Sequence, residues 1–203
     1  MNEKKPVPIL SDFNTLALVL IPIGIGINYV GGLIVKALQL PIYLDAIGTL
    51  IVGIIAGPWV GAVTGALANV VFGLTVDPIF LPYLIVNLAF GLAAGFMARA
   101  GWFERWQTVW AAGLVIFALG VILSAPINVF FFGGVPESPT ASVIWTYFIA
   151  IGANLWQSVI ATSVLREIAD KFISVFVAYG VYKAFPKRFL LKFPGYVRKG
   201  AHS

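Results

Sequence analysis

Seven strongly polar side chains interrupt the apolar stretches of this sequence, and their chemistry suits the binding of a polar solute. Amides and carboxylates can donate or accept hydrogen bonds, and a lysine adds a positive charge. Asp170 and Lys171 are neighbours whose charges can pair with each other, which leaves the sign of a solute open. The seven residues are Asn28, Asp45, Asn69, Asn87, Asn128, Asp170 and Lys171.

The sequence lacks the residue patterns on which most enzymes depend. It has no cysteine and one histidine, the penultimate residue His202, so we expect no metal site and no thiol chemistry. A G-x-x-x-x-G-K-[ST] loop for ATP is missing. So are the paired aspartates, the Ser–His pair and the zinc motif that an intramembrane protease needs within its spans. We therefore expect neither an enzyme nor a bound cofactor.

The composition predicts an all-α membrane protein. Sixty per cent of the 203 residues are hydrophobic and 10% are charged, whereas a soluble domain carries about 25% charged residues. Most of the exterior must therefore face the lipid bilayer. We expect one integral membrane domain over residues 1–203, with a cytoplasmic segment 1–10, a basic cytoplasmic tail 186–203 and no cleaved signal peptide.

Apolar stretches of suitable length predict the membrane crossings, since a spanning helix needs about 20 mostly apolar residues. Gly57-Pro58 interrupts the stretch Tyr43–Leu74, and proline disfavours helix in the residue before it, so we divide this stretch into two short crossings. One long kinked helix is the alternative. The first five predicted crossings are Thr15–Lys36, Tyr43–Ala56, Trp59–Leu74, Ile79–Ala98 and Thr108–Phe130.

The distribution of positive charge favours two crossings over one kinked helix. Lys and Arg concentrate in cytoplasmic loops, and with a turn at Gly57-Pro58 ten of the thirteen cationic residues fall on one side. The basic excess then anchors loops at the inner surface, so we expect no nucleic-acid partner. The ten are Lys4, Lys5, Arg99, Arg105, Lys183, Lys187, Arg188, Lys192, Arg198 and Lys199.

The C-terminal third is too long for one crossing. A basic tail on the inside requires a last crossing over about Arg166–Ala184, which leaves Ser142–Val164 as an interfacial or re-entrant helix on the outer face. A seventh crossing, with the tail outside, is the alternative. The preferred fold therefore has six transmembrane helices, both termini in the cytoplasm and an extra helix between the last two crossings.

With this topology, the polar side chains lie at mid-depth or nearer the outside. Each asparagine alone could be a helix–helix hydrogen bond, Asp45 could cap a helix, and Asp170-Lys171 could be an ion pair at the headgroups. Their common depth instead predicts one polar depression open to the outside, of the kind that captures a small molecule. Tyr83 or Trp156 would offer its stacking surface.

Glycines form a second pattern, because Gly53, Gly57, Gly61 and Gly65 recur every four residues. Such spacing lets helix backbones approach closely, either within this chain or against another membrane subunit. Both interpretations remain open at this point.

Three segments resemble the substrate-binding (S) components of energy-coupling factor transporters. These are LPIYLDAIGT from Leu40, GPWVGAVTG from Gly57, and DKFIS from Asp170 with the basic tail that follows; the likeness extends over about Leu16–Arg188. The resemblance implies a six-helix protein that binds a vitamin-like molecule at its outer face. It also implies a membrane coupling (T) subunit and two cytosolic ABC-type ATPases as partners, and transport by toppling of the S component.

One departure from the family concerns docking on the coupling subunit. An Ala-x-x-x-Ala pair in the first helix is common in the family, but here Ala17 is followed by Ile21. We expect docking to use Gly24 or the glycines Gly57, Gly61 and Gly65 instead. A membrane sensor domain and an autonomous secondary carrier are the alternative functions.

Overall fold

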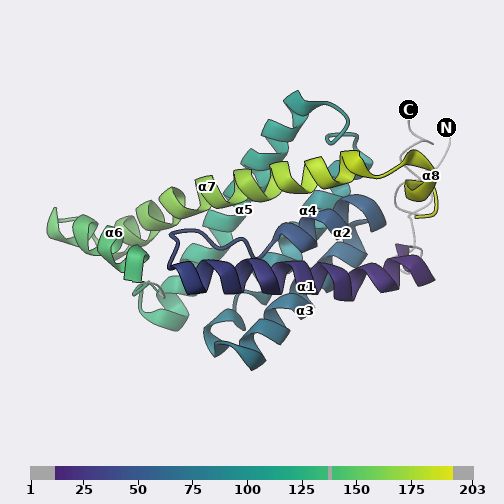
Figure 1. Ribbon diagram of the computed structural model, residues 1–203. Helices are drawn as coiled ribbons and strands as arrows, with labels where there is room; N and C mark the ends of the chain where they lie inside the picture. The colour runs from purple at the N-terminus through teal and green to yellow at the C-terminus, as the bar shows by residue number, and fades with distance from the viewer. Residues whose placement is uncertain (1–11, 137–138, 194–203) are drawn as a thin grey trace, which may run out of the picture.

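A computed structural model describes residues 12–136 and 139–193, and its regular elements are helices (Figure 1). The predicted segment 1–10, the end of the basic tail and His202 lie outside the described residues. The helices are α1 (Thr15–Leu38), α2 (Ile47–Ala56), α3 (Pro58–Thr75), η2 (Pro78–Phe80), α4 (Leu84–Arg99), α5 (Trp106–Phe132), α6 (Pro139–Ala150), α7 (Leu155–Ala184) and α8 (Lys187–Leu190).

The helices carry apolar side chains outward and polar ones inward. Helices α1, α3 and α5 are long and apolar enough to cross a membrane, and α2, α4 and Thr140–Ala150 are shorter apolar helices. On α1, Leu18 and Ile23 are exposed, whereas Asn28 is buried. On α7, four successive charged positions at residues 166, 167, 170 and 171 are buried. This inversion of the usual soluble pattern is that of a helical membrane protein.

The helices run between two ends of the bundle. At the first end, the start of α1, the α2–α3 turn, the end of α4 and the end of α7 meet. The contacts there are an ion pair of Arg99 with Asp12, a hydrogen bond from Tyr182 to Glu104 (3.2 Å) and one from Asn14 to the Lys192 carbonyl (2.9 Å).

At the second end, the end of α1, the start of α6, the α3–α4 connection and the last turns of α5 meet. The contacts are Lys36 with Asp77 (3.2 Å), Thr140 with the Gln39 carbonyl (3.0 Å) and Tyr83 with Asn128 (2.5 Å). Helices α1 to α5 therefore alternate in direction, and α7 returns to the first end. This path suits six crossings; their number and orientation stay a prediction.

The division at Gly57-Pro58 is confirmed. Helix α2 ends at Ala56 and α3 begins at Pro58, so the alternative of one kinked helix is wrong. Gly57 has φ +111°, a conformation that side chains disfavour, and proline suits the first position of a helix because its missing N–H has no partner there.

Helix α2 is shorter than the predicted crossing Tyr43–Ala56. It begins at Ile47, and its ten residues span about 15 Å, half of the hydrocarbon thickness. The preceding segment Leu40–Ala46 is irregular and runs between α1 and α7 (Figure 1). We refer to it as the outer strap. Irregular backbone at this depth requires that protein groups bind its N–H and C=O groups, which the site below supplies.

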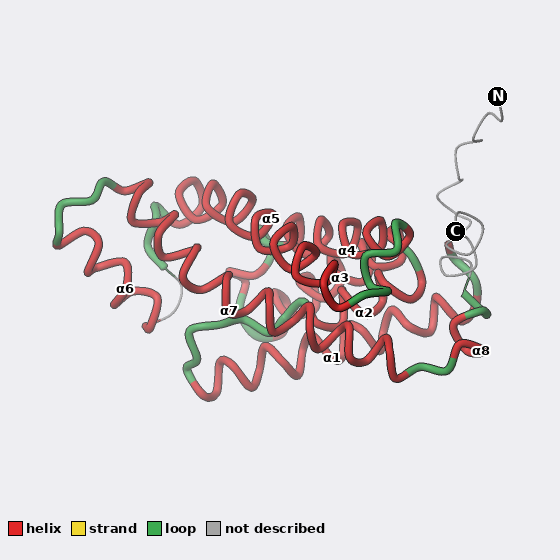
Figure 2. Tube along the Cα trace, turned by 90° about the horizontal axis from the view of Figure 1, so that it is seen from above, coloured by secondary structure: helices red, strands yellow, loops and turns green. Residues whose placement is uncertain are grey.

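The predicted break near residue 165 is wrong. Helix α7 is continuous from Leu155 to Ala184, and the break lies at residues 151–154 instead. Gly152 has φ +90° there, and the side chain of Asn154 caps α7 in a reciprocal pair with Gln157. Helix α6 is thus a separate helix between α5 and α7, and it projects with the start of α7 from the bundle (Figure 2).

The four glycines proposed for docking are buried inside this chain. Gly24 packs against Val52 and Thr64, Gly57 against Asp12, Gly61 against Gly53 and Gly91, and Gly65 against Asn87 and Thr49. All four therefore pack against other helices of this chain, and docking of another subunit at Gly24, Gly57, Gly61 and Gly65 stays a prediction. Their small size serves the close approach of α1, α2, α3 and α4.

Gly91 tests this packing. A Cβ atom at this position would collide with the backbone of Gly61 and Ala62, which cannot move aside as a flexible side chain can. We expect Gly91→Ala to destabilise the fold by about 1–3 kcal/mol, seen as a lower thermal unfolding midpoint in detergent. Gly180→Ala is the control, because an added Cβ meets nothing within 4 Å there. Equal midpoints for the two variants would contradict the packing.

Candidate functional site

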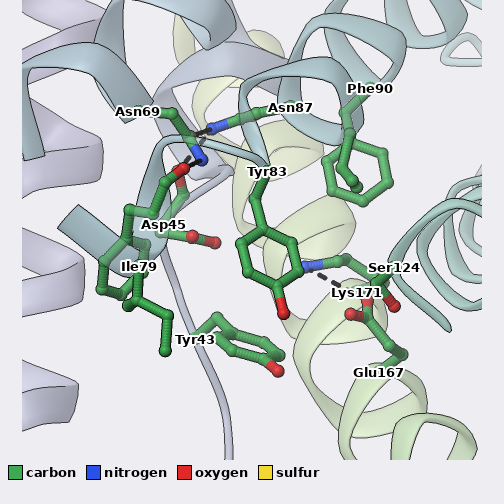
Figure 3. Close-up of a pocket in the computed structure, with 12 residues that line it drawn as sticks. Tyr43, Asp45, Asn69, Ile79, Tyr83, Asn87, Phe90, Ser124, Glu167 and Lys171 are labelled. Carbon is green, nitrogen blue, oxygen red and sulfur yellow. Dashed lines mark hydrogen bonds and ion pairs between the residues drawn. The ribbon is translucent and has the colours of Figure 1, made fainter. Parts of the chain in front are cut away.

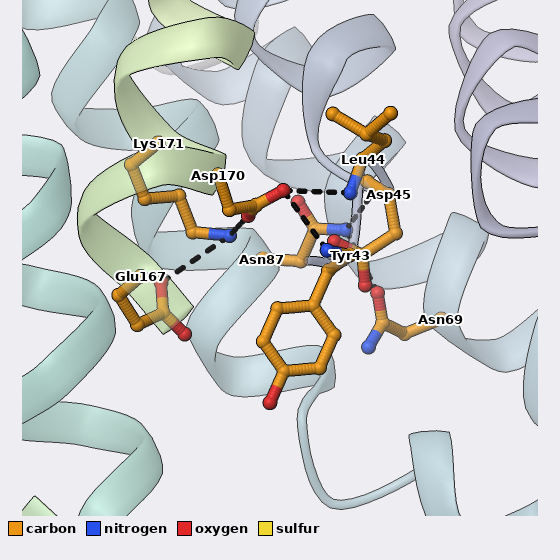
Figure 4. Close-up of polar contacts among 8 residues, drawn as sticks. All are labelled: Tyr43, Leu44, Asp45, Asn69, Asn87, Glu167, Asp170 and Lys171. Atoms are coloured by element: carbon orange, nitrogen blue, oxygen red, sulfur yellow. Dashed lines mark hydrogen bonds and ion pairs between the residues drawn. The ribbon is translucent and has the colours of Figure 1, made fainter. Parts of the chain in front are cut away.

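Asp170 holds the outer strap in place. Its Oδ1 accepts hydrogen bonds from the backbone N–H groups of Tyr43 (3.0 Å) and Leu44 (2.7 Å), as Figure 4 shows. Leu44 has φ +51°, which is uncommon for a residue other than glycine. Asp170 is fully buried. A carboxylate therefore satisfies two donors that the apolar interior would otherwise leave without partners.

Lys171 is a buried cation between two carboxylates. Its ammonium group pairs with Asp170 and lies 3.3 Å from Oε2 of Glu167, one helical turn earlier on α7. It also lies 4.8 Å from the centre of the Phe90 ring and 5.4 Å from that of Tyr43. Burial of such a charge is tolerated only with partners of this kind.

Two amides connect α3, α4 and the outer strap. Asn69 Nδ2 donates to the Phe80 carbonyl (3.1 Å), and Asn87 Nδ2 donates to Asn69 Oδ1 (2.8 Å) and to the Asp45 carbonyl (3.2 Å). Backbone carbonyls only accept hydrogen bonds, so the two contacts fix which way both amides are turned. Oδ1 of Asn87 is then left without a hydrogen bond.

These groups surround a cavity of about 40 Å³, which we call the inner cavity (Figure 3). Three polar atoms of its wall are buried and accept or donate no hydrogen bond within the described chain: Asn87 Oδ1, Ser124 Oγ and Glu167 Oε2. The contact of Glu167 with Lys171 is an ion pair without hydrogen-bond geometry. The lining residues are Tyr43, Asp45, Asn69, Ile79, Phe80, Tyr83, Val86, Asn87, Phe90, Ser124, Glu167 and Lys171.

Unpaired buried polar atoms are rare in proteins, because each costs about 1–3 kcal/mol. Three around one cavity suit a site that binds a polar solute. Figure 3 also shows the Asp45 carboxylate pointing toward the other lining residues. Within the described residues, no group of three or more His, Asp or Glu side chains is placed to hold a metal ion.

A second, larger cavity of about 150 Å³ lies beside the inner one, toward the second end. We call it the outer cavity. The two share Tyr43, Ile79 and Phe80, and the outer one reaches Lys36 and Thr140. Arg166, another lining residue, places its guanidinium 4.1 Å from the centre of the Tyr43 ring. The outer cavity therefore lies between the inner cavity and the second end of the bundle.

Five of the nine predicted binding residues line the inner cavity. They are Asp45, Asn69, Tyr83, Asn87 and Lys171.

The other four do not line the inner cavity, although Asn28 lines a small neighbouring cavity together with Asp45 and Asn69. Asn28 joins α1 to α2 through hydrogen bonds with Thr49 (2.8 Å) and the Gly48 N–H (2.6 Å). Asn128 accepts the Tyr83 hydroxyl and lines a different small cavity. Asp170 lies behind the outer strap, and Trp156 is exposed against Phe130, 6.0 Å between ring centres.

Sequence reasoning missed Glu167, Ser124 and the aromatic wall of Tyr43, Phe80 and Phe90. Glu167 stands four residues before Lys171, a spacing that places both on one face of a helix, so this signal was present in the sequence. Ser124 carried no such signal, because a hydroxyl in an apolar helix ordinarily bonds a backbone carbonyl of its own helix.

A family model described as "ECF transporter, substrate-specific component" matches residues 16–182. No curated protein and no solved structure matches the chain. The matched range includes every residue that lines the inner and outer cavities. The family model describes a transporter component rather than an enzyme. The chain therefore belongs to the family of substrate-specific components of ECF transporters.

Proposed function

We propose that this protein captures a small water-soluble molecule of the vitamin type and takes it up at the cell membrane, with high affinity. The family accounts for substrate-specific uptake with an ECF module. The observation that carries the proposal further is the inner cavity, where Asn87, Ser124 and Glu167 each keep a buried polar atom without a hydrogen bond. A bound solute would supply the missing bonds and offset the cost of burying these atoms.

The walls of the inner cavity suit a ring-shaped solute. Phe80, Tyr83 and Phe90 contribute aromatic surface, and a few polar groups converge among them. This combination of apolar walls with few polar contacts is typical of small-molecule sites. The residues that we assign to substrate binding are Asp45, Asn69, Tyr83, Asn87, Ser124, Glu167 and Lys171.

We further propose that the second end faces outward. Arg99, Lys183 and Lys187 lie at the first end, and basic residues favour the cytoplasmic side. The chain then forms one integral membrane domain with six crossings and both termini in the cytoplasm. The outer cavity would be the way in from outside. Between the inner cavity and the first end, Ile55 and Val60 belong to a packed apolar core, which favours capture over conduction.

A protein that captures a solute needs a partner to move it. We propose a membrane coupling subunit and two cytosolic ABC-type ATPases as partners. Co-expression of the tagged chain with these subunits from the same organism tests this proposal. We expect all subunits to purify together and to give ATP-dependent uptake in proteoliposomes. Uptake by this chain alone would favour a secondary carrier, and co-purification of a kinase would favour a sensor; either would contradict the proposal.

A substitution at Ser124 should change the affinity for the solute without changing the stability of the protein. Because its hydroxyl has no hydrogen bond in the described protein, Ser124→Ala is expected to leave the thermal unfolding midpoint unchanged. The same change should weaken binding of the co-purified molecule by about 3- to 10-fold, the value of one hydrogen bond. Titration calorimetry of the ligand-depleted protein measures this effect.

Ser174→Ala is the matched control. Ser174 on α7 is also fully buried and without a hydrogen bond, but it does not line the inner cavity. Its affinity should equal that of the wild type. A Ser124→Ala variant that binds as tightly as Ser174→Ala would remove Ser124 from the site.

A further inference from the structure

We infer that the solute of the inner cavity is a small aromatic ring that carries N–H donors or a positive charge, and that a carboxylate in the same place is rejected. This inference rests on the proposed function and specifies the chemical class of its substrate. It depends on which polar groups of the wall are already used by the protein.

Apart from the Ser124 hydroxyl, the donors named here are used within the protein. Asn69 Nδ2 donates to the Phe80 carbonyl, and Asn87 Nδ2 donates to Asn69 and to the Asp45 carbonyl. The Tyr83 hydroxyl donates to Asn128 at 2.5 Å. The ammonium of Lys171 is held by Asp170 and Glu167. An anionic solute could accept a hydrogen bond from the Ser124 hydroxyl, but to gain a donor from these other groups it would have to break their contacts.

The acceptors of the wall remain available. Oδ1 of Asn87 accepts no hydrogen bond, and Oε2 of Glu167 has the ion pair with Lys171 at 3.3 Å but accepts no hydrogen bond; both atoms are buried. The carboxylate of Asp45 forms no ion pair within the described part of the chain. Acceptors without donors are satisfied by N–H groups of a solute, and carboxylates among them favour a cation.

The charges around the inner cavity also favour a cationic solute over an anionic one. Asp45, Glu167 and Asp170 supply three carboxylates against the one ammonium group of Lys171. Arg166 is the next cation, but its guanidinium lies over the Tyr43 ring and lines the outer cavity instead. A negative group entering the inner cavity therefore meets an excess of negative charge in a setting with little water to screen it.

Aromatic side chains determine the shape of the solute that the inner cavity can accept. The rings of Tyr43, Phe80, Tyr83 and Phe90 all line the cavity, so a flat ring that enters it would have aromatic faces to stack against. At about 40 Å³ the cavity accepts a single ring only if Tyr43 or Phe80, the residues shared with the outer cavity, give way. The same volume would hold a few water molecules, and water alone is the competing occupant.

Two matched pairs of compounds test the inference. Nicotinamide and nicotinate share a ring and differ in an amide against a carboxylate. Pyridoxamine and 4-pyridoxate share a ring and differ in an aminomethyl group against a carboxylate. Ligand-depleted protein in nanodiscs is incubated with each compound at about 1 mM, and native mass spectrometry measures the bound fraction.

We expect the amide or amine of at least one pair to bind at least about tenfold more tightly than its acid. Equal binding of both members, preference for the acids, or retention of none of the four would overturn the inference. Co-purification of the coupling module and ATP-dependent uptake are measured on the same preparation. If these succeed while the acids are preferred, the proposed function stands and only the assigned substrate class fails.

Charge-removing variants link the preference to the named residues. Glu167→Gln and Asp45→Asn should each lower the ratio of amine to acid binding by about tenfold. If Glu167→Gln does not fold, Asp45→Asn still tests the inference. Asp45 is only half-buried and has no ion pair to lose, so we expect this variant to fold. Glu104→Gln, at an exposed ion pair with Lys183 at the first end of the bundle, is the control and should leave the ratio unchanged. An unchanged ratio in both cavity variants would contradict the inference.

Discussion

Replacement of Asp170 by alanine is expected to destabilise the protein by about 3–5 kcal/mol and to abolish solute binding, the largest effect among the single substitutions considered. The change leaves Lys171 buried with one carboxylate instead of two. It also removes the acceptor of the Tyr43 and Leu44 N–H groups, so the outer strap loses its attachment to α7. Thermal unfolding in detergent and titration of the co-purified molecule measure the two effects.

Two other variants show where this effect comes from. Asp170→Asn keeps an oxygen for the two strap N–H groups but loses the charge, so its loss of stability should be smaller than that of Asp170→Ala. Asp77→Asn removes an equally charged side chain at the exposed pair with Lys36 and should cost about 0–1 kcal/mol. If Asp170→Ala unfolds at the same temperature as Asp77→Asn, the strap is not held as described.

Replacement of Asn87 by leucine is expected to weaken solute binding by about 100-fold or more. Asn87 gives the inner cavity its free Oδ1 atom and also holds Asn69 and the Asp45 carbonyl in position through Nδ2. Leucine removes the solute contact and leaves two acceptors unpaired, so stability should fall by about 1–3 kcal/mol as well. Titration calorimetry and thermal unfolding measure the two losses.

Asn28→Leu is the matched control for Asn87→Leu. Asn28 is also a buried amide that joins helices, through Thr49 and the Gly48 N–H, but it does not line the inner cavity. We expect a similar loss of stability with binding largely kept. If both variants lose binding in proportion to stability, Asn87 has a structural role only.

Local signals in the sequence were enough for much of the fold. Gly57-Pro58 marked the α2–α3 turn because glycine and proline act within a residue or two of their own position. The outer strap could not be predicted in this way. Its apolar residues resemble those of a helix, and the side chain that binds its N–H groups is Asp170, 126 and 127 positions further along the chain.

The site shows the same division between local and distant information. The predicted depth in the membrane was enough to place Asn69, Asn87 and Lys171 at one cavity, because helices that alternate in direction bring residues of equal depth close together. Depth could not tell which face of a helix each residue occupies. Asn28 lies at a helix–helix contact and Trp156 is exposed, and neither residue lines the inner cavity.

The glycines illustrate a different limit. Spacing of four residues predicts a surface that allows close approach, but not which helix approaches it. Here Gly61 meets Gly53 and Gly91 of the same chain. Which helix packs against these glycines depends on the tertiary structure and cannot be read from their spacing in the sequence.

A structure of the protein with its co-purified molecule bound, determined by cryo-electron microscopy with the coupling module, is the most direct measurement. We predict a ring among Tyr43, Tyr83 and Phe90, with N–H groups about 3 Å from Asn87 Oδ1 and from the carboxylate of Glu167. Density confined to the outer cavity beside Lys36, or an acidic group against Glu167, would contradict this account of the site.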